Sequence, residues 1–124
     1  MSSTPCVFLS RKGGTVVEFA LVLPAFVMLL VGGFHVAMLA FTASSIHQAV
    51  QAGARCASVN TALCGTREKT VAYTEETFVS LGATPTFTST TADCGHLVSG
   101  RMSYNLDAGL ARIAVPLSAQ ACFP

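Results

Sequence analysis

The sequence predicts an α+β fold, in which a long N-terminal transmembrane helix extends outside the membrane. A small domain with a short helix and a few antiparallel strands follows it. The 25 residues from Phe19 to Ala43 contain no Asp, Glu, Lys or Arg. Helical periodicity continues after them, and strand-like alternation marks the end of the chain. We therefore expect a leader (1–13), a transmembrane and extended helix (14–60) and a small extracytoplasmic domain (61–124).

The uncharged run is long enough to span a lipid bilayer, because about 20 apolar residues cross a core of about 30 Å. The chain is 52% hydrophobic and 10% charged, whereas an ordinary soluble domain is about 25% charged. Arg11 and Lys12 precede the run, and such residues favour the cytoplasmic side. The N-terminus is therefore expected inside and the C-terminal domain outside. A secretory signal cut near Ser44 is disfavoured, because its apolar region would have about 7–15 residues.

The helix is predicted to start near Gly14 or Thr15 and to continue to Ser58. At about 1.5 Å per residue it would be about 65–70 Å long, so part of it must project from the membrane. Pro24 lies within the span. Proline removes a backbone hydrogen bond, so we expect a helix kink there.

A ridge of small residues follows the span at four-residue steps: Ala49, Gly53 and Ala57. Such ridges allow another helix to approach closely. The same face could instead be covered by the small domain. The sequence leaves both interpretations of this helix-packing face open.

The small domain begins with a break in the helical pattern at Thr61–Gly65. Arg67–Leu81 then predicts a short helix, for which Gly82 is a plausible stop. Thr84–Thr91 is rich in threonine and fits a loop or an edge strand.

Two further strands are predicted from alternating apolar positions, at Leu97–Leu106 and at Val115–Phe123. Pro116 should lie near the start of the last strand or on a sheet edge, because proline cannot donate a ladder hydrogen bond.

The five cysteines predict two disulfides. Removal of the leader would take Cys6 with it and leave four cysteines outside the membrane, where disulfides persist. Four cysteines allow three pairings, and we favour the two bonds Cys56–Cys64 and Cys94–Cys122. Such bonds would help a domain this small, whose core is marginal by itself.

A zinc site built on Cys94-Gly95-His96 is the competing interpretation of the cysteines. It is disfavoured, because the spacings match none of the usual paired patterns. The sequence has no nucleophile elbow, no phosphate loop and no paired-carboxylate motif. We therefore expect no enzyme, no catalytic residue, no metal and no cofactor. The absence of Trp and of a basic patch also argues against nucleic-acid binding.

Glu18 is the only charged residue in the first four turns of the predicted helix. An ionisable group at the centre of a membrane helix costs about 2.5–3.5 kcal/mol. Glu18 could be an interfacial residue, which the positive N-terminal end of a helix favours. It could also pair with another charge, such as a newly exposed α-amino group.

The segment Gly13-Gly14-Thr15-Val16-Val17-Glu18-Phe19 resembles the processing site of type IV pilin-like proteins. A cut between Gly13 and Gly14 makes Glu18 the fifth residue of the mature chain and Phe19 the sixth. The continuation to Pro24 resembles the TadE-like family of Tad (tight adherence, Flp) pilus assembly proteins.

Later segments also resemble that family: Ala49–Arg55 after the span, the strand containing Tyr104, and Leu117–Phe123 at the end. The likeness is strongest around the processing site. A TadF-like or TadG-like subtype stays open, because those relatives share the N-terminal pattern.

The resemblance implies a minor pseudopilin that a membrane-embedded prepilin peptidase cuts after Gly13, with Glu18 and Phe19 used in recognition and assembly. It implies a single-pass protein of the bacterial inner membrane. The implied partners are other Tad pseudopilins, the major Flp pilin and the inner-membrane Tad assembly platform. The implied role is in pilus biogenesis, adhesion and biofilm formation. The alternative is a bitopic envelope protein with a disulfide-bonded interaction domain and an uncleaved N-terminus.

Overall fold

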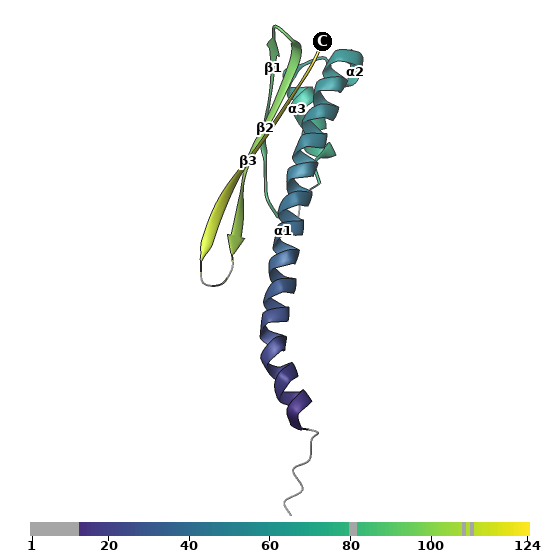
Figure 1. Cartoon of the computed structure of the whole chain (residues 1–124). Helices are drawn as coiled ribbons and strands as arrows, with labels where there is room; N and C mark the ends of the chain where they lie inside the picture. Colours follow the sequence, from purple (N-terminus) through teal and green to yellow (C-terminus); the bar gives the residue numbers. More distant parts are fainter. Residues whose placement is uncertain (1–12, 80–81, 108, 110) are drawn as a thin grey trace, which may run out of the picture. The chain divides into compact units, whose positions relative to one another are not determined.

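A computed structural model describes residues 13–79, 82–107, 109 and 111–124 of the chain. Its elements, labelled in Figure 1, are α1 (Gly13–Val59), α2 (Thr61–Cys64), α3 (Arg67–Thr77), β1 (Thr86–Ala92), β2 (Gly95–Asp107) and β3 (Arg112–Phe123). The predicted α+β fold, with a long apolar helix before a small domain, is confirmed. The chain divides into two compact units, one ending at Phe34 and one comprising His35–Pro124.

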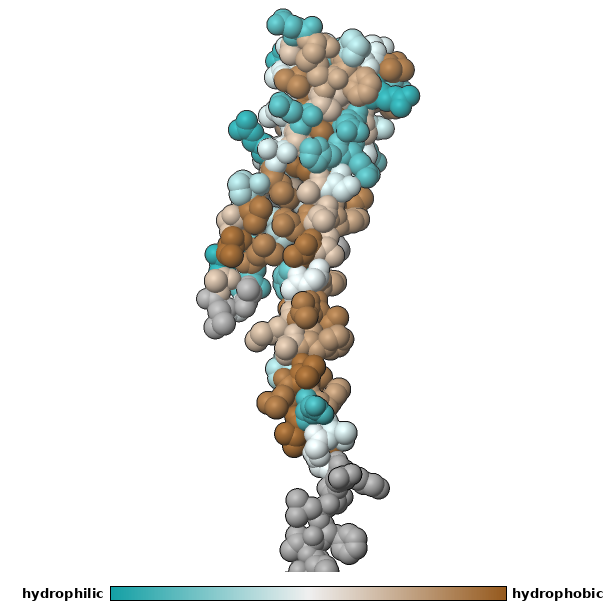
Figure 2. All heavy atoms as spheres, viewed as in Figure 1, coloured by the Kyte–Doolittle hydropathy of each residue, from teal (hydrophilic) through white to brown (hydrophobic). Residues whose placement is uncertain are grey.

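The first unit contains the apolar part of α1, in which every described side chain is exposed. Figure 2 shows hydrophobic residues over this part of the helix. By length and composition α1 is able to cross a membrane, which is compatible with a single-pass membrane protein. Pro24 lies inside the helix, and the kink at this residue stays a prediction.

The second unit begins with the rest of α1, which buries one face and exposes the other. Its polar side chains, such as His47, Gln51 and Arg55, are exposed. The buried positions recur every three or four residues, as expected for one face of a helix. They are Thr42, Ile46, Ala49, Val50, Gly53, Ala54 and Ala57.

Two short helices follow the end of α1, and a polar side chain caps each. The Asn60 side chain accepts a hydrogen bond from the backbone N–H of Leu63 at 3.2 Å. The Thr66 hydroxyl accepts one from the N–H of Lys69 at 3.3 Å. Such caps satisfy N–H groups that have no partner within the helix. The predicted break at Thr61–Gly65 is therefore a real interruption, but it contains the single turn of α2.

The predicted end of the next helix is wrong. The expectation was a helix to Leu81 with Gly82 as its stop, whereas α3 ends at Thr77. Phe78 turns to an extended backbone, and its ring packs edge-on against Phe87 with centroids 5.9 Å apart. The extended backbone at Phe78 and this aromatic contact occur together at the end of the helix. The acidic pair that precedes Thr77 also disfavours a longer helix, because carboxylates oppose the negative C-terminal end.

The three strands form one antiparallel sheet in the order β1-β2-β3. The strands predicted at Leu97–Leu106 and Val115–Phe123 are present, and both are longer than predicted. Thr84–Thr91 contains most of the edge strand β1 rather than a loop. β1 pairs only with Gly95–Arg101 of β2, whereas β3 pairs with β2 along His96–Asp107. The Met102–Asp107 part of β2 therefore forms a two-stranded hairpin with β3. Pro116 lies on the other edge strand, β3, in agreement with the prediction.

The core of the second unit joins α1 to the sheet. Its sheet residues include Phe87, Val98 and Met102, and they pack against Ile46 and its neighbours on α1. Gly100 makes the close approach possible, since a Cβ there would lie 2.6 Å from the Phe87 ring and 3.1 Å from the Ile46 side chain.

The small-residue ridge of α1 packs inside this unit. Ala49, Gly53 and Ala57 are all buried. A Cβ on Gly53 would overlap the hydroxyl of Thr74 on α3. That hydroxyl is buried and donates to the carbonyl of Thr70 at 2.7 Å. The structure thus favours the interpretation in which the small domain covers the ridge.

Replacing Gly53 by alanine is expected to destabilise the second unit. Overpacking costs about 1–3 kcal/mol, and the better helix propensity of alanine recovers about 1 kcal/mol of that. We therefore expect a net loss of up to about 2 kcal/mol, measured by pulse proteolysis in detergent. The matched control is Gly33→Ala, since a Cβ on Gly33 meets nothing within 4 Å. In a Thr74→Ala background the cost of Gly53→Ala should fall, and an unchanged cost would contradict the overlap.

Candidate processing and assembly segment

The residues of the predicted cut begin α1. Gly13 and Gly14 are the first two described residues, both helical and both exposed. A Cβ on either glycine would meet nothing within 4 Å. Glycine disfavours the helix by about 1 kcal/mol per residue, so this end of α1 is intrinsically easy to unwind. The rest of the predicted leader, with Cys6, lies outside the described residues.

Glu18 and Phe19 lie one turn further along the helix and are exposed. The Phe19 side chain is 66% exposed. Within the described part of the chain, Glu18 has no hydrogen bond or ion pair. It follows Gly14 by four residues, and residues four apart on a helix are surface neighbours. A carboxylate is thus available on the side of the helix where a cut would create an amine.

Comparison with known proteins identifies the family that most of α1 resembles. Residues 13–55 match the family model described as TadE-like protein. This segment of the chain is TadE-like. The resemblance predicted from Gly13–Pro24 and from Ala49–Arg55 is therefore confirmed, and a TadE-like segment implies a role associated with Tad pili. No curated protein matches the chain, and no solved structure matches it.

The TadE-like match starts at Gly13 and stops at Arg55, before any residue of the sheet. It includes both the fully exposed apolar part of α1 and most of the buried ridge. The predicted resemblance at Tyr104 and at Leu117–Phe123 lies beyond the match and stays a prediction.

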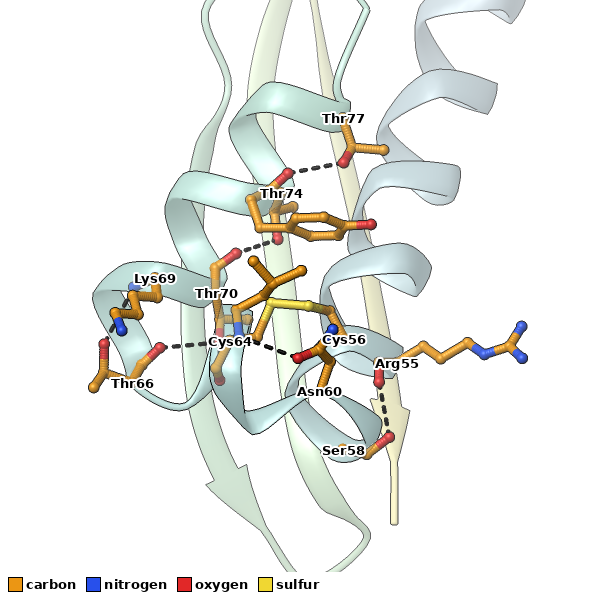
Figure 3. Close-up of a disulfide and its surroundings, with 12 residues drawn as sticks. Arg55, Cys56, Ser58, Asn60, Cys64, Thr66, Lys69, Thr70, Thr74 and Thr77 are labelled. Atoms are coloured by element: carbon orange, nitrogen blue, oxygen red, sulfur yellow. Dashed lines mark hydrogen bonds between the residues drawn. A yellow bond between two sulfur atoms is a disulfide. The ribbon is translucent and has the colours of Figure 1, made fainter.

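The first disulfide closes the turn from α1 to α2. Cys56 is bonded to Cys64, with their Cα atoms 5.7 Å apart, as Figure 3 shows. The Thr70 hydroxyl donates to the Cys64 carbonyl at 3.1 Å and so joins α3 to the same corner.

The second disulfide joins Cys94, in the turn between β1 and β2, to Cys122 near the end of β3. The pairing agrees with the one favoured from the sequence. Because both sulfurs are bonded, Cys94 is not a thiolate ligand for the alternative zinc site with His96. Among the described residues, no group of three or more His, Cys, Asp or Glu could hold a metal ion.

The sequence did not predict the hydroxyl hydrogen bonds that hold α3 and the residues after it in place. Ser45 on α1 donates to the carbonyl of Val79 at 2.8 Å and accepts from its N–H at 3.0 Å. Thr70 and Thr74 are fully buried in a helix with a polar sequence. Their four-residue spacing was the available signal, since threonine hydroxyls can bond a carbonyl one turn earlier.

Removal of the Cys94–Cys122 bond is expected to cost more stability than removal of Cys56–Cys64. The two bonds join residues 28 and 8 positions apart. Loop-closure entropy then gives about 3–4 kcal/mol for the longer loop and about 2–3 kcal/mol for the shorter. Cys94→Ser/Cys122→Ser and Cys56→Ser/Cys64→Ser variants, compared by denaturant unfolding, test the order. Non-reducing peptide mapping of the unaltered protein tests the pairing itself.

Proposed function

We propose that this protein is a minor pseudopilin-like component of Tad (Flp-type) pilus assembly. The observation that carries the proposal is the TadE-like match that starts at Gly13, on a helix with an accessible Glu18. The proposed role is in pilus biogenesis and adhesion, without catalysis and without a cofactor.

A prepilin peptidase is the proposed processing enzyme, with Gly13-Gly14 as the bond that it cuts. The two exposed glycines offer an unobstructed backbone at a weak helix end. Glu18 and Phe19 expose side chains close to this bond and provide recognition.

Glu18 is proposed to hold neighbouring subunits in register. At the edge of a bilayer an unpaired carboxylate is costly. After the cut, the α-amino group of Gly14, in its own or an adjacent subunit, supplies the opposite charge. Two such charges at about 4 Å gain several kcal/mol at an intermediate dielectric constant.

The proposed location is the bacterial inner membrane, with the second unit on the outer side. The partners are other Tad pseudopilins, the major Flp pilin and the inner-membrane assembly platform. Two disulfides in the second unit favour an oxidising compartment, which agrees with this topology.

The second candidate is a bitopic envelope protein that keeps its leader. The observation in its favour is that the disulfide-bonded sheet lies outside the TadE-like match. Such a protein would use the second unit to bind a partner and α1 only as an anchor.

Changing Gly13 to leucine is expected to abolish processing, because a bulky side chain would occupy the position before the cut. The full-length protein should then accumulate in membranes, as seen by intact mass. Gly32→Leu is the matched control, since a Cβ on Gly32 also meets nothing within 4 Å. A normal mature mass for Gly13→Leu would count against pilin-type processing at this bond and indicate a cut elsewhere, which N-terminal sequencing locates. A full-length mass for the unaltered protein would favour the bitopic anchor.

Changing Glu18 to glutamine is expected to leave membrane insertion intact and to reduce assembly strongly, because the amide carries no charge for the amine. Co-purification with other pilus components and counts of surface pili are the measurements. Glu76→Gln, on the exposed surface of α3, controls for loss of a carboxylate as such. A processed Glu18→Gln protein that assembles normally would remove the charge pair from the proposal.

A further inference from the structure

The end of the β2–β3 hairpin is a two-sided ribbon. On one face three cross-strand pairs are apolar: Met102 with Leu117, Tyr104 with Val115, and Leu106 with Ile113. The other face carries Ser103 with Pro116, Asn105 with Ala114, and Asp107 with Arg112. An alternation this regular indicates a ribbon with an apolar environment on one side only.

The apolar face is well covered near the core and open at the end of the hairpin. Met102 is 7% exposed, whereas Ile113 is 57% exposed. Tyr104 and Leu106 are half-buried. The outermost pair, Leu106 with Ile113, is thus an apolar surface that no described element covers completely. Figure 2 shows hydrophobic side chains on this part of the hairpin.

β2 runs along α1 in the opposite direction, so this open end points toward His35. His96, at the start of β2, lines the same cavity as Cys64 and Thr66, which follow the end of α1. Gly100 lies against Ile46, ten residues or more before that end. The strand therefore passes the helix from its C-terminal end toward its N-terminal end, as Figure 1 shows for this unit.

The hairpin is long enough to reach the level at which α1 would leave a membrane. From Gly100 to Leu106 the strand advances at most about 20 Å, which equals about 13 helical residues. Counted back from Ile46, this distance reaches at most to about residue 33, so the part of α1 that begins at His35 lies within the reach of the strand. A bilayer core of about 20 helical residues that starts at Phe19 ends near Met38. Met38 lies within the reach of the strand, so the hairpin is long enough to arrive at the level of the bilayer surface.

We propose that the apolar end of the hairpin, the pair Leu106 and Ile113 with Tyr104 and Val115, rests in the outer interface of the lipid bilayer. This inference rests on the membrane-anchored function proposed above. A tyrosine is suited to the interface between lipid and water. On the aqueous face, Arg112 binds Asp107 at 2.9 Å and is 85% exposed, so the carboxylate enters the headgroup region already paired.

A lipid surface fits this patch better than a protein partner does. A stable protein interface needs about 800 Å² on each side. Four side chains, three of them half-buried, provide much less. A bilayer requires no such area, because the anchoring helix already holds the hairpin beside it.

The chain contains no Trp, so a single introduced tryptophan is a fluorescence reporter without background. The full-length protein is reconstituted into phosphatidylcholine–phosphatidylglycerol vesicles whose acyl chains are brominated close to the headgroup. Ile113→Trp should show blue-shifted emission and lose most of its fluorescence to the bromolipid. Ala114→Trp is the matched control, because it lies beside Ile113 on the opposite, exposed face. It should be quenched much less.

Phe26→Trp, in the apolar part of α1, reports insertion of the helix itself. If Phe26→Trp is quenched and Ile113→Trp emits as in water, the hairpin contact is overturned while the anchoring survives. Blue-shifted but unquenched Ile113→Trp would mean burial by protein, which also overturns the lipid contact. An unquenched Phe26→Trp would refute the span and with it the proposed function. Val115→Trp, on the same face, repeats the test if Ile113→Trp does not fold.

Discussion

The close packing of α3 and the sheet onto one face of α1 is the constraint on which the rest of the second unit depends. Gly53 leaves room for the Thr74 hydroxyl, and Gly100 leaves room for the Phe87 ring and Ile46. Because these two positions carry no side chain, the helices α1 and α3 and the sheet come close enough to share one core. A core of this size has little reserve, so a small increase in volume at either glycine has a large effect.

The two disulfides close the same end of this unit. Cys56–Cys64 lies at the end of α1, where the chain reverses through a helix of a single turn. Cys94–Cys122 joins the end of the sheet at which β2 begins and β3 ends. Both bonds therefore lie at the α2 side of the unit, away from the open end of the hairpin. The hairpin end depends only on its ladder and its cross-strand pairs, which suits a segment stabilised by an external surface.

The sequence was sufficient for the order and type of most elements, because each has a strong local signal. The uncharged run predicted α1, and the alternation around Tyr104 and Leu117 predicted β2 and β3. It failed at the end of α3, where the chain leaves the helix after Thr77 and Phe78 packs against Phe87, a residue distant in the sequence. It also left the ridge at Gly53 undecided. A small residue signals close approach but does not identify the neighbour, and Thr74 lies in a helix without an apolar stripe. The processing segment was predicted from resemblance, since the position of Glu18 alone left an interfacial residue and a charge pair equally open.

The sheet edges indicate which surfaces remain for association with other subunits. β3 is an edge strand, and Pro116 in its middle lacks an N–H group. Proline on an edge impedes the addition of another strand. At the opposite edge of the sheet, Phe78 at the end of α3 packs against Phe87 of β1. Strand addition is therefore disfavoured at β3, and the buried face of α1 in the second unit is already covered by its own domain.

The part of α1 that ends at Phe34 is different, because its described side chains are exposed on all sides. Association through this segment, as proposed above, would leave the sheet free and would bring the carboxylate of Glu18 to the surface that neighbouring helices share.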